Sequence, residues 1–428
     1  MTAAPPSAGI EERLSAAGLP ALPRSAWLEI DLDAIAANAR AIRSILAPGV
    51  GLAPVVKADA YGHGLTVVAR TLVASGVDVL CVATFDEAVV LRDAGIEHPV
   101  LVLFQPPFSA LEEAAARRID VAASDAGRLD ALLDAWDRIR RAWPGGPSGG
   151  PLPDLRLHLE VETGLERAGV APERVPAALT AIGARAGVVV AGLWSHLASA
   201  PDRAVTADQV ARFDRARDLV AAAGLRCPPR HIDASGALFA GTAPHLELVR
   251  PGLSIYGVLP TDLPVAPEVA GAAAALVPAM SLRARPLRLE DVPAGHGVGY
   301  GGRWVAPRPS RVATLPVGYG DGWGYGAAGA EALVRGRRVR QVGTVAMDAI
   351  MVDVTDVPGV GPADEFVLLG GQGDDRITAH ELARHRTTIP YEILAGMSRR
   401  LPRVYDLGAG PIGLRTLSGE FLREATFR

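Results

Sequence analysis

Eight short apolar runs, each followed by an amphipathic stretch rich in Ala, Leu and Arg, constrain the fold of this chain most strongly. Their hydrophobic residues run on without alternation, which is typical of parallel strands buried on both faces. Eight such units match the size of a closed (β/α)8 barrel. An open, doubly wound sheet is the alternative, because periodicity alone does not separate the two. The expected strands are 53–57, 77–84, 99–104, 120–124, 155–162, 188–196, 231–235 and 247–253.

The sequence changes character after about residue 275. Short strand-like segments separated by Gly, Pro and Asp indicate a mostly β C-terminal domain, with helices expected only near 378–384 and 391–399. The expected strands of that domain are 279–285, 311–316, 338–345, 349–354 and 365–369.

We therefore expect three parts. Residues 1–24, rich in Ala, Pro and Ser, form a loosely packed N-terminal extension; residues 25–275 form the barrel; and residues 276–428 form the β domain. A first strand near 26–31 could join the β domain. The Gly- and Pro-rich segment 143–153 reads as an inserted loop.

Composition limits the classes of function. The chain is 49% hydrophobic and 21% charged, with a net charge of −4, and no basic run suggests nucleic-acid binding. No apolar stretch reaches the roughly 18 residues of a membrane span, and the first residues lack the pattern of a secretory signal. Cys81 and Cys227 cannot form a disulfide framework, and no zinc-ligand spacing is present. We expect a cytoplasmic enzyme that binds neither metal, membrane nor nucleic acid.

The sharpest motif is Val-Val-Lys-Ala-Asp-Ala-Tyr-Gly-His-Gly, from Val55 to Gly64, at the carboxyl end of the first expected barrel strand. Active sites of barrel enzymes lie at that end. Burial would lower the pKa of Lys57 and favour the neutral amine that forms a Schiff base. A lysine that reaches along the barrel rim into water is the alternative, and position alone leaves the two equal.

This run resembles the cofactor-lysine motif of the alanine racemase family, which belongs to the fold-type III pyridoxal-phosphate enzymes. The resemblance extends from about Trp27 to Tyr405. It implies that Lys57 holds pyridoxal 5'-phosphate as an internal aldimine and that Tyr61 hydrogen-bonds the phosphate.

The same resemblance implies that Ser235, Gly252 and Leu253 also bind the phosphate, together with Tyr391. The first three lie at the ends of the seventh and eighth strands, and the loops after these strands are the usual phosphate site of such barrels. The family normally has Asn before this Ser, where the present chain has Ala234. One polar contact to the cofactor is therefore missing.

Two arginines are assigned by resemblance. Arg250 would face the pyridine nitrogen, and because a guanidinium does not give up its proton, the ring nitrogen would stay neutral and transamination would be suppressed. Arg167 would contact the cofactor's phenolic oxygen and the substrate carboxylate. Glu160 stands where many family members carry a carbamylated lysine, and we expect its carboxylate to pair with Arg167. Without the resemblance, Arg250 would read as an ordinary surface arginine, and Glu160 as part of a salt bridge elsewhere in the barrel.

Racemisation exchanges protons on both faces of the substrate α-carbon, which is simplest with one base on each face. The resemblance makes Lys57 one base and Tyr300, in a loop with five nearby glycines, the other. It makes His196 the hydrogen-bonded neighbour of Tyr300 and Arg250, and it places His196 among both the catalytic and the cofactor-binding residues.

Three further residues of the β domain are assigned in the same way. The backbone N–H of Met347 would meet the substrate carboxylate, with Asp348 as a supporting neighbour, and Tyr319 would line the substrate channel. In the family, such residues reach the barrel from the partner subunit of a homodimer with shared active sites.

The implied activity is the interconversion of L-alanine and D-alanine, which supplies D-alanine to the cell wall in the family. The departures at Glu160 and Ala234 leave open a racemase of other or more varied small amino acids, such as serine. A fold-related decarboxylase is disfavoured by Arg250 and by the lack of its cysteine-bearing motif. A non-enzymatic pyridoxal-phosphate carrier would not need the second domain or Tyr300.

Overall fold

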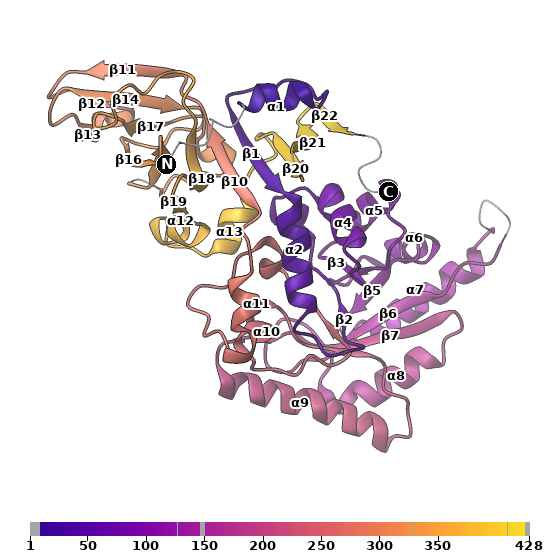
Figure 1. Ribbon diagram of the computed structural model, residues 1–428. Coiled ribbons are helices and arrows are strands. Elements are labelled where there is room, and N and C mark those ends of the chain that lie inside the picture. The colour runs from indigo at the N-terminus through magenta and orange to yellow at the C-terminus, as the bar shows by residue number, and fades with distance from the viewer. Residues whose placement is uncertain (1–8, 126, 146–149, 328, 409, 424–428) are drawn as a thin grey trace.

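The computed structural model describes residues 9–125, 127–145, 150–327, 329–408 and 410–423 (Figure 1). Strands β3 to β8 form a six-stranded parallel sheet, and β2 pairs in parallel with β9. Isolated parallel bridges between Val55 and Cys81 and between Ala234 and Arg250 join the two sets into a closed ring. The (β/α)8 barrel is confirmed, and the open sheet is excluded. The barrel strands are β2 (Gly51–Leu52), β3 (Leu80–Val82), β4 (Val100–Val102), β5 (Asp120–Ala123), β6 (Leu155–Glu160), β7 (Val188–Trp194), β8 (Arg230–His231) and β9 (Leu248–Val249).

Helices cover the outside of the barrel, as expected for strands that are apolar on both faces. Helix α2 (Leu32–Arg43), which precedes the first barrel strand, is fixed to the last barrel segment by Asn38. Its side-chain amide donates to the carbonyls of Ile255 and Val277 and accepts from the Val277 N–H, at 2.8–3.0 Å. The other barrel helices are α4 (Leu65–Ala74), α5 (Phe85–Asp93), α6 (Leu111–Ala116), α7 (Leu129–Ala142), α8 (Val175–Gly183), α9 (Arg203–Ala222), α10 (Ser235–Ala240) and α11 (Ala270–Ala274).

The second domain is a large, mostly antiparallel sheet. β1 (Ala26–Asp31) lies inside it, antiparallel to β10 (Met280–Ala284) and parallel to β20 (Arg403–Leu407). All five strands expected after residue 275 are present, as β10, β14 (Ser310–Leu315), β16 (Arg337–Val342), β17 (Ile350–Asp353) and β18 (Phe366–Gln372). The two expected helices are α12 (Ala379–Arg386) and α13 (Pro390–Ala395).

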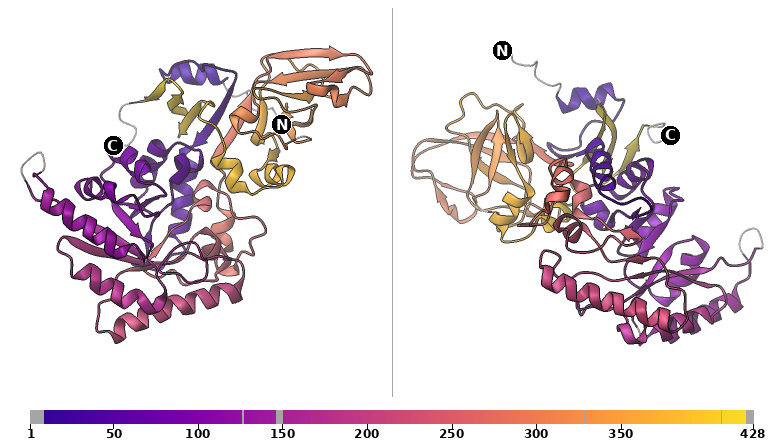
Figure 2. Two further views of the ribbon diagram at one scale, coloured as in Figure 1. Left: turned by 180° about the vertical axis from the view of Figure 1, so that it is seen from behind. Right: turned by 60° about the horizontal axis from the view of Figure 1, so that its bottom comes forward.

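Several short strands were not expected: β11 (Arg288–Val292), β12 (Gly297–Val298), β13 (Trp304–Val305), β15 (Glu331–Val334), β19 (Asp375–Ile377), β21 (Gly410–Thr416) and β22 (Gly419–Leu422). Figure 2 shows that the arm containing β11 to β14 and β17 projects away from the barrel. Among the described residues, no helix combines the length and apolar character that a membrane crossing requires.

The expectation of a loosely packed N-terminal extension is wrong for residues 10–16, which form helix α1 (Ile10–Ala16). Ile10 and Leu14 lie one helical turn apart and are fully buried against Trp27 and Leu414 of the β sheet. Residues 1–8 lie outside the described part of the chain. In the Gly- and Pro-rich loop, the described residues 143–145 and 150–153 carry neither helix nor strand, as expected.

Candidate active site

A cavity of about 590 Å³ opens at the carboxyl ends of the barrel strands. All nine residues that the sequence analysis assigns to the cofactor line it: Lys57, Tyr61, Arg167, His196, Ser235, Arg250, Gly252, Leu253 and Tyr391. They come from the ends of five barrel strands or the loops that follow them, and from helix α13, so the fold brings together residues that are 334 positions apart in the sequence (residues 57 to 391).

A larger cavity, of about 690 Å³, lies between the barrel and the β domain and has none of these residues among its described lining. Of its charged lining residues, Arg283 donates to Glu29 at 2.6 Å. We place the chemistry in the smaller cavity, where an amine, a buried guanidinium group and phenols converge.

Lys57 is half-buried and lies just after the carboxyl end of the first barrel strand. Burial lowers the pKa of its amine, and the nearby Arg167 charge lowers that pKa further. Lys57 is also the one lysine in a chain whose lysines and arginines total 43. The sequence analysis missed this signal. Arginine supplies positive charge elsewhere, but it cannot provide the neutral amine that a Schiff base needs.

The four residues after Lys57 form a turn of rare geometry. Ala58, Asp59, Ala60 and Tyr61 all have φ between 51° and 57°, in the left-handed region. This conformation costs roughly 1–2 kcal/mol for each residue other than glycine, so surrounding contacts must hold the turn.

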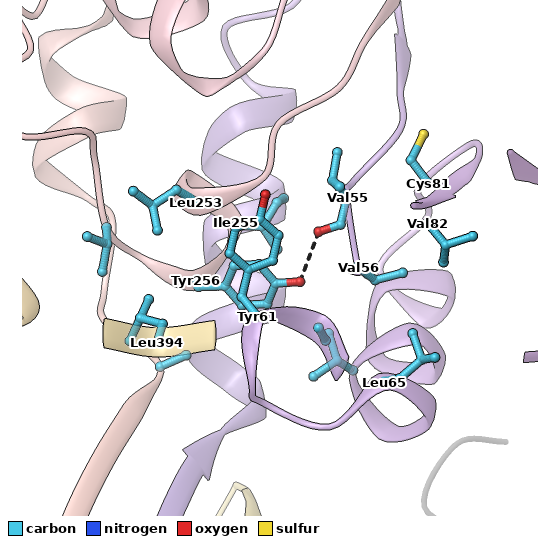
Figure 3. Close-up of a cluster of buried hydrophobic side chains, with 14 of the residues drawn as sticks. Val55, Val56, Tyr61, Leu65, Cys81, Val82, Leu253, Ile255, Tyr256 and Leu394 are labelled. Carbon is cyan, nitrogen blue, oxygen red and sulfur yellow. Dashed lines mark hydrogen bonds between the residues drawn. The ribbon is translucent and has the colours of Figure 1, made fainter. Parts of the chain in front are cut away.

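The turn aims Tyr61 into a stack of aromatic rings (Figure 3). The centroid of the Tyr61 ring lies 4.9 Å from that of Tyr256, and the centroid of the Tyr256 ring lies 4.4 Å from that of His63. The Tyr256 hydroxyl donates to the Val55 carbonyl at 3.0 Å and so ties the stack to the first barrel strand. Burial raises the pKa of Tyr61, which keeps its hydroxyl protonated as a hydrogen-bond donor.

The ends of the seventh and eighth strands form a small polar cradle. The N–H groups of Gly252 and Ser254 donate to Ser235 Oγ at 2.9 and 3.3 Å, and the two serine hydroxyls lie 2.9 Å apart. A Cβ atom on Gly252 would lie 2.5 Å from the Tyr61 hydroxyl, so only glycine lets that phenol reach the cradle. Hydroxyls and backbone N–H groups around one point are a donor set that suits a phosphate dianion.

Arg250 lies on the cavity wall and is only 2% exposed. Its guanidinium donates to the Ser195 carbonyl at 2.8 Å and to His231 Nδ1, and it lies 5.1 Å from the Trp194 ring. Burial lowers the pKa of Arg250 to about 10, which still leaves it protonated at neutral pH.

The Arg250 hydrogen bond continues as a chain through the barrel. His231 Nε2 lies 2.9 Å from His158 Nδ1, and His158 Nε2 lies 3.3 Å from Asp120 Oδ2. Burial, with the Arg250 charge and His158, holds the pKa of His231 well below its usual value. Because Arg250 donates to Nδ1, neutral His231 carries its proton on Nε2 and donates to His158, which in turn donates to Asp120. This series of hydrogen bonds thus fixes the position of the Arg250 guanidinium.

The expected hydrogen bond between His196 and Arg250 is wrong. Within the described residues, the Arg250 guanidinium bonds to His231 and to backbone carbonyls, because His231 lies on the neighbouring strand end and points at it. His196 lines the cavity, where burial followed by the charges of Arg250, Arg167 and Lys57 lowers its pKa to about 3.

Glu160 is 3% exposed at the end of β6, and its Oε1 lies 3.4 Å from Arg167. This is the pairing that the sequence analysis expects. Burial raises the pKa of Glu160 above its usual value. The Arg167 guanidinium also lies 5.4 Å from the Phe104 ring, so it is held between an acid and an aromatic face.

Of the residues assigned from the β domain, Tyr391 lines the cavity of its own chain, whereas Tyr300, Met347 and Tyr319 do not. Tyr300, Met347 and Tyr319 are 73%, 52% and 43% exposed, respectively. The Tyr300 carbonyl accepts from Thr344 Oγ1 at 3.0 Å, and Asp348 accepts from Arg400 at 2.6 Å. Within one chain, the structure therefore assembles the barrel residues of the predicted site and Tyr391, but not Tyr300, Met347 or Tyr319.

Fold and cavity define a barrel enzyme with one amine at its mouth beside a phosphate cradle and a buried arginine. Sequence profiles described as the N-terminal and C-terminal domains of alanine racemase match residues 30–260 and 279–405. The chain therefore belongs to the alanine racemase family, which confirms the resemblance found in the sequence.

Individual relatives agree with the profiles. The alanine racemases of Desulfovibrio desulfuricans and Sorangium cellulosum are 36% and 38% identical to this chain; the alignments cover 89% and 82% of it and 98% and 90% of those proteins. Among solved structures, alanine racemase from Bacillus anthracis with bound L-Ala-P has a TM-score of 0.82 at 29% identity, covering 92% of this chain and 98% of that one. The enzyme from a D-cycloserine-producing Streptomyces lavendulae has a TM-score of 0.80 at 36% identity, covering 91% and 98%.

Proposed function

We propose that this protein interconverts L-alanine and D-alanine in the cytoplasm, with pyridoxal phosphate bound through Lys57, and so supplies D-alanine to the cell wall. The observation that carries the proposal is the convergence of nine residues, from five barrel strand ends and helix α13, on one cavity that holds the chain's single lysine. When bound, pyridoxal phosphate supplies a carbonyl carbon that joins to amines and a ring that takes up the electrons of a broken Cα–H bond.

The residues present fit this group. Ser235, Gly252 and Tyr61 would hold the phosphate, and Arg250 would hold the ring nitrogen without protonating it. Arg167, steadied by Glu160, would bind the substrate carboxylate. Ala234, which lines the cavity, contributes no polar group there.

Two residues would move the proton of the substrate α-carbon. Lys57 suits one face, because its lowered pKa leaves more of its amine neutral. Tyr300 would serve the other face from the partner subunit of a homodimer, together with Met347 and Tyr319. The exposure of these three side chains, which lie outside the cavity of their own chain, supports that arrangement.

The single lysine makes the cofactor site directly testable. Borohydride reduction of the loaded protein should attach one cofactor per chain, at Lys57, as measured by mass spectrometry of the peptides. A separate, unreduced sample of the cofactor-loaded protein should be assayed for D-amino-acid formation from L-alanine, L-serine and L-lysine. D-Alanine as the main product is expected, whereas release of carbon dioxide alone would refute the proposal, and preferred turnover of serine would change the substrate.

The shared site can be tested by mixing two inactive variants, Lys57→Ala and Tyr300→Phe. A mixed dimer would contain one intact site, built from Lys57 of one chain and Tyr300 of the other. Random reassortment should therefore restore about one quarter of the wild-type activity. No recovery after verified exchange of subunits would show that both residues act within one chain.

A further inference from the structure

A partly buried ion pair links the C-terminal strand β21 to the turn that follows Lys57. Arg415, on β21, donates from its two terminal nitrogens to the two oxygens of Asp59, at 2.8 and 2.5 Å. The side chains are only 14% and 18% exposed, although the residues are 356 positions apart. Arg415 lies beyond residue 405, where the match to the C-terminal profile of the family ends.

Asp59 is the second of the four left-handed residues, so its carboxylate is well placed to hold the turn. Its Oδ1 also accepts from the Leu65 N–H at 2.9 Å, at the start of helix α4. Burial alone would raise the pKa of Asp59, but the hydrogen bonds from Arg415 and Leu65 outweigh it, and the pKa is lowered. An ionised carboxylate thus connects the turn, a barrel helix and the C-terminal hairpin.

Neighbouring residues of the C-terminal segment hold the same turn. Arg403 donates to the Gly62 carbonyl from two nitrogens, both at 3.2 Å. Tyr405 packs so closely on Gly64 that a Cβ atom there would lie 2.1 Å from the Tyr405 hydroxyl. Of these contacts, the one from Arg415 alone reaches a side chain within the strained run itself.

We propose that Arg415 is a positioning residue for the cofactor site: through Asp59 it holds the left-handed turn that sets Lys57 on one side and Tyr61 on the other. The proposal rests on the proposed function for the roles of Lys57 and Tyr61. Its physical basis is that a strained backbone persists only where surrounding contacts determine it. Without Arg415, the turn would relax, and the amine and the phenol would lose their fixed separation.

The test compares Arg415→Met and Arg415→Lys with a matched control, Arg335→Met. Arg335 also makes a two-point ion pair, with Asp364 at 2.8 and 2.9 Å, but that pair lies on the β domain and Arg335 is 46% exposed. Two readouts are needed: hydrogen exchange of residues 57–65 in cofactor-free protein, and the dissociation constant for pyridoxal phosphate from absorbance titration.

We expect Arg415→Met to speed exchange in residues 57–65 and to weaken pyridoxal phosphate binding about 10- to 100-fold, the effect of losing hydrogen bonds to a buried charge. Arg415→Lys should restore part of the slow exchange and part of the pyridoxal phosphate affinity. Arg335→Met should change neither the exchange rates nor the affinity. If Arg415→Met does not fold, Asp59→Asn, which keeps the acceptor for Leu65, takes its place. Unchanged exchange and a dissociation constant within twofold of wild type would overturn the proposal.

The exchange measurement separates this proposal from the proposed function. It is made without cofactor, so it reports on the turn even if Lys57 were found to carry no adduct. A wild-type protein that shows slow exchange in residues 57–65 but no reducible cofactor would refute the proposed function alone.

Discussion

Replacing Gly192 with alanine should break the hydrogen-bonded chain behind Arg250 without touching the cavity. A Cβ atom at Gly192, on β7, would lie 2.3 Å from His158 Nδ1 and 2.7 Å from its Cε1. Real contacts of this kind stay beyond about 3.4 Å, so the His158 ring must move by about 1 Å. That shift would break its 2.9 Å hydrogen bond to His231.

Two costs add in this variant. Overpacking a rigid core costs about 1–3 kcal/mol, and a buried donor left without a partner on His231 costs about 1–3 kcal/mol. We expect the free energy of unfolding to fall by about 2–6 kcal/mol, and kcat/KM to fall about tenfold because Arg250 loses its fixed position. Thermal unfolding followed by circular dichroism and a racemisation assay measure the two effects.

Gly183→Ala is the control for this experiment. Gly183 ends helix α8, and no other atom lies within 4 Å of an added Cβ there, so the change should stabilise the helix slightly. Unchanged stability and activity in Gly192→Ala would refute the reasoning, since it would mean that His158 is not held between β7 and His231.

Four further outcomes are expected. Glu160→Gln should raise KM and lower kcat, because Arg167 loses its charged partner; unchanged kinetics would remove this role. Tyr300→Phe should lower kcat at least about 100-fold while leaving the absorbance of bound cofactor unaltered; a smaller loss would point to another base. Ala234→Asn should return an amide to the cavity and tighten pyridoxal phosphate binding by up to about tenfold in absorbance titrations, whereas weaker binding would show that the side chain does not fit. Since the folded-state pKa of Asp59 is lowered from 3.8, its ion pair should stabilise the protein fully above that pH and be lost as pH falls through the folded value; melting temperatures of Asp59→Asn should therefore show a weaker acid dependence than wild type.

The barrel could be predicted because its strands are apolar on both faces, a pattern that leaves few other folds. Residues 10–16 were misjudged, since an Ala- and Pro-rich background hides the single pair Ile10 and Leu14 that the sheet buries. Some strands of the β domain, such as β12 and β13, are only two residues long, which is too short to show an alternating pattern.

The barrel half of the site was predicted from motifs at strand ends, but its contacts were not. Nothing in the sequence shows that Arg250 turns to His231 rather than to His196, because this depends on the twist of neighbouring strands. The sequence does not predict the pairing of Asp59 with Arg415 either, since this ion pair joins residues near opposite ends of the chain. A left-handed turn without glycine also contradicts local preference, so only the folded surroundings explain it.

The solitary ε-amine of Lys57 has a consequence for carbonyl chemistry on this protein as a whole. Reactive aldehydes, including the cofactor's own, ordinarily find many lysine side chains on a protein surface and form adducts with them. Here every other cationic side chain of the lysine–arginine type is a guanidinium, so no competing lysine side chain draws the aldehyde away from the barrel mouth. The amino-acid composition therefore makes aldehydes selective for one lysine, in addition to the selectivity that the shape of the cavity provides.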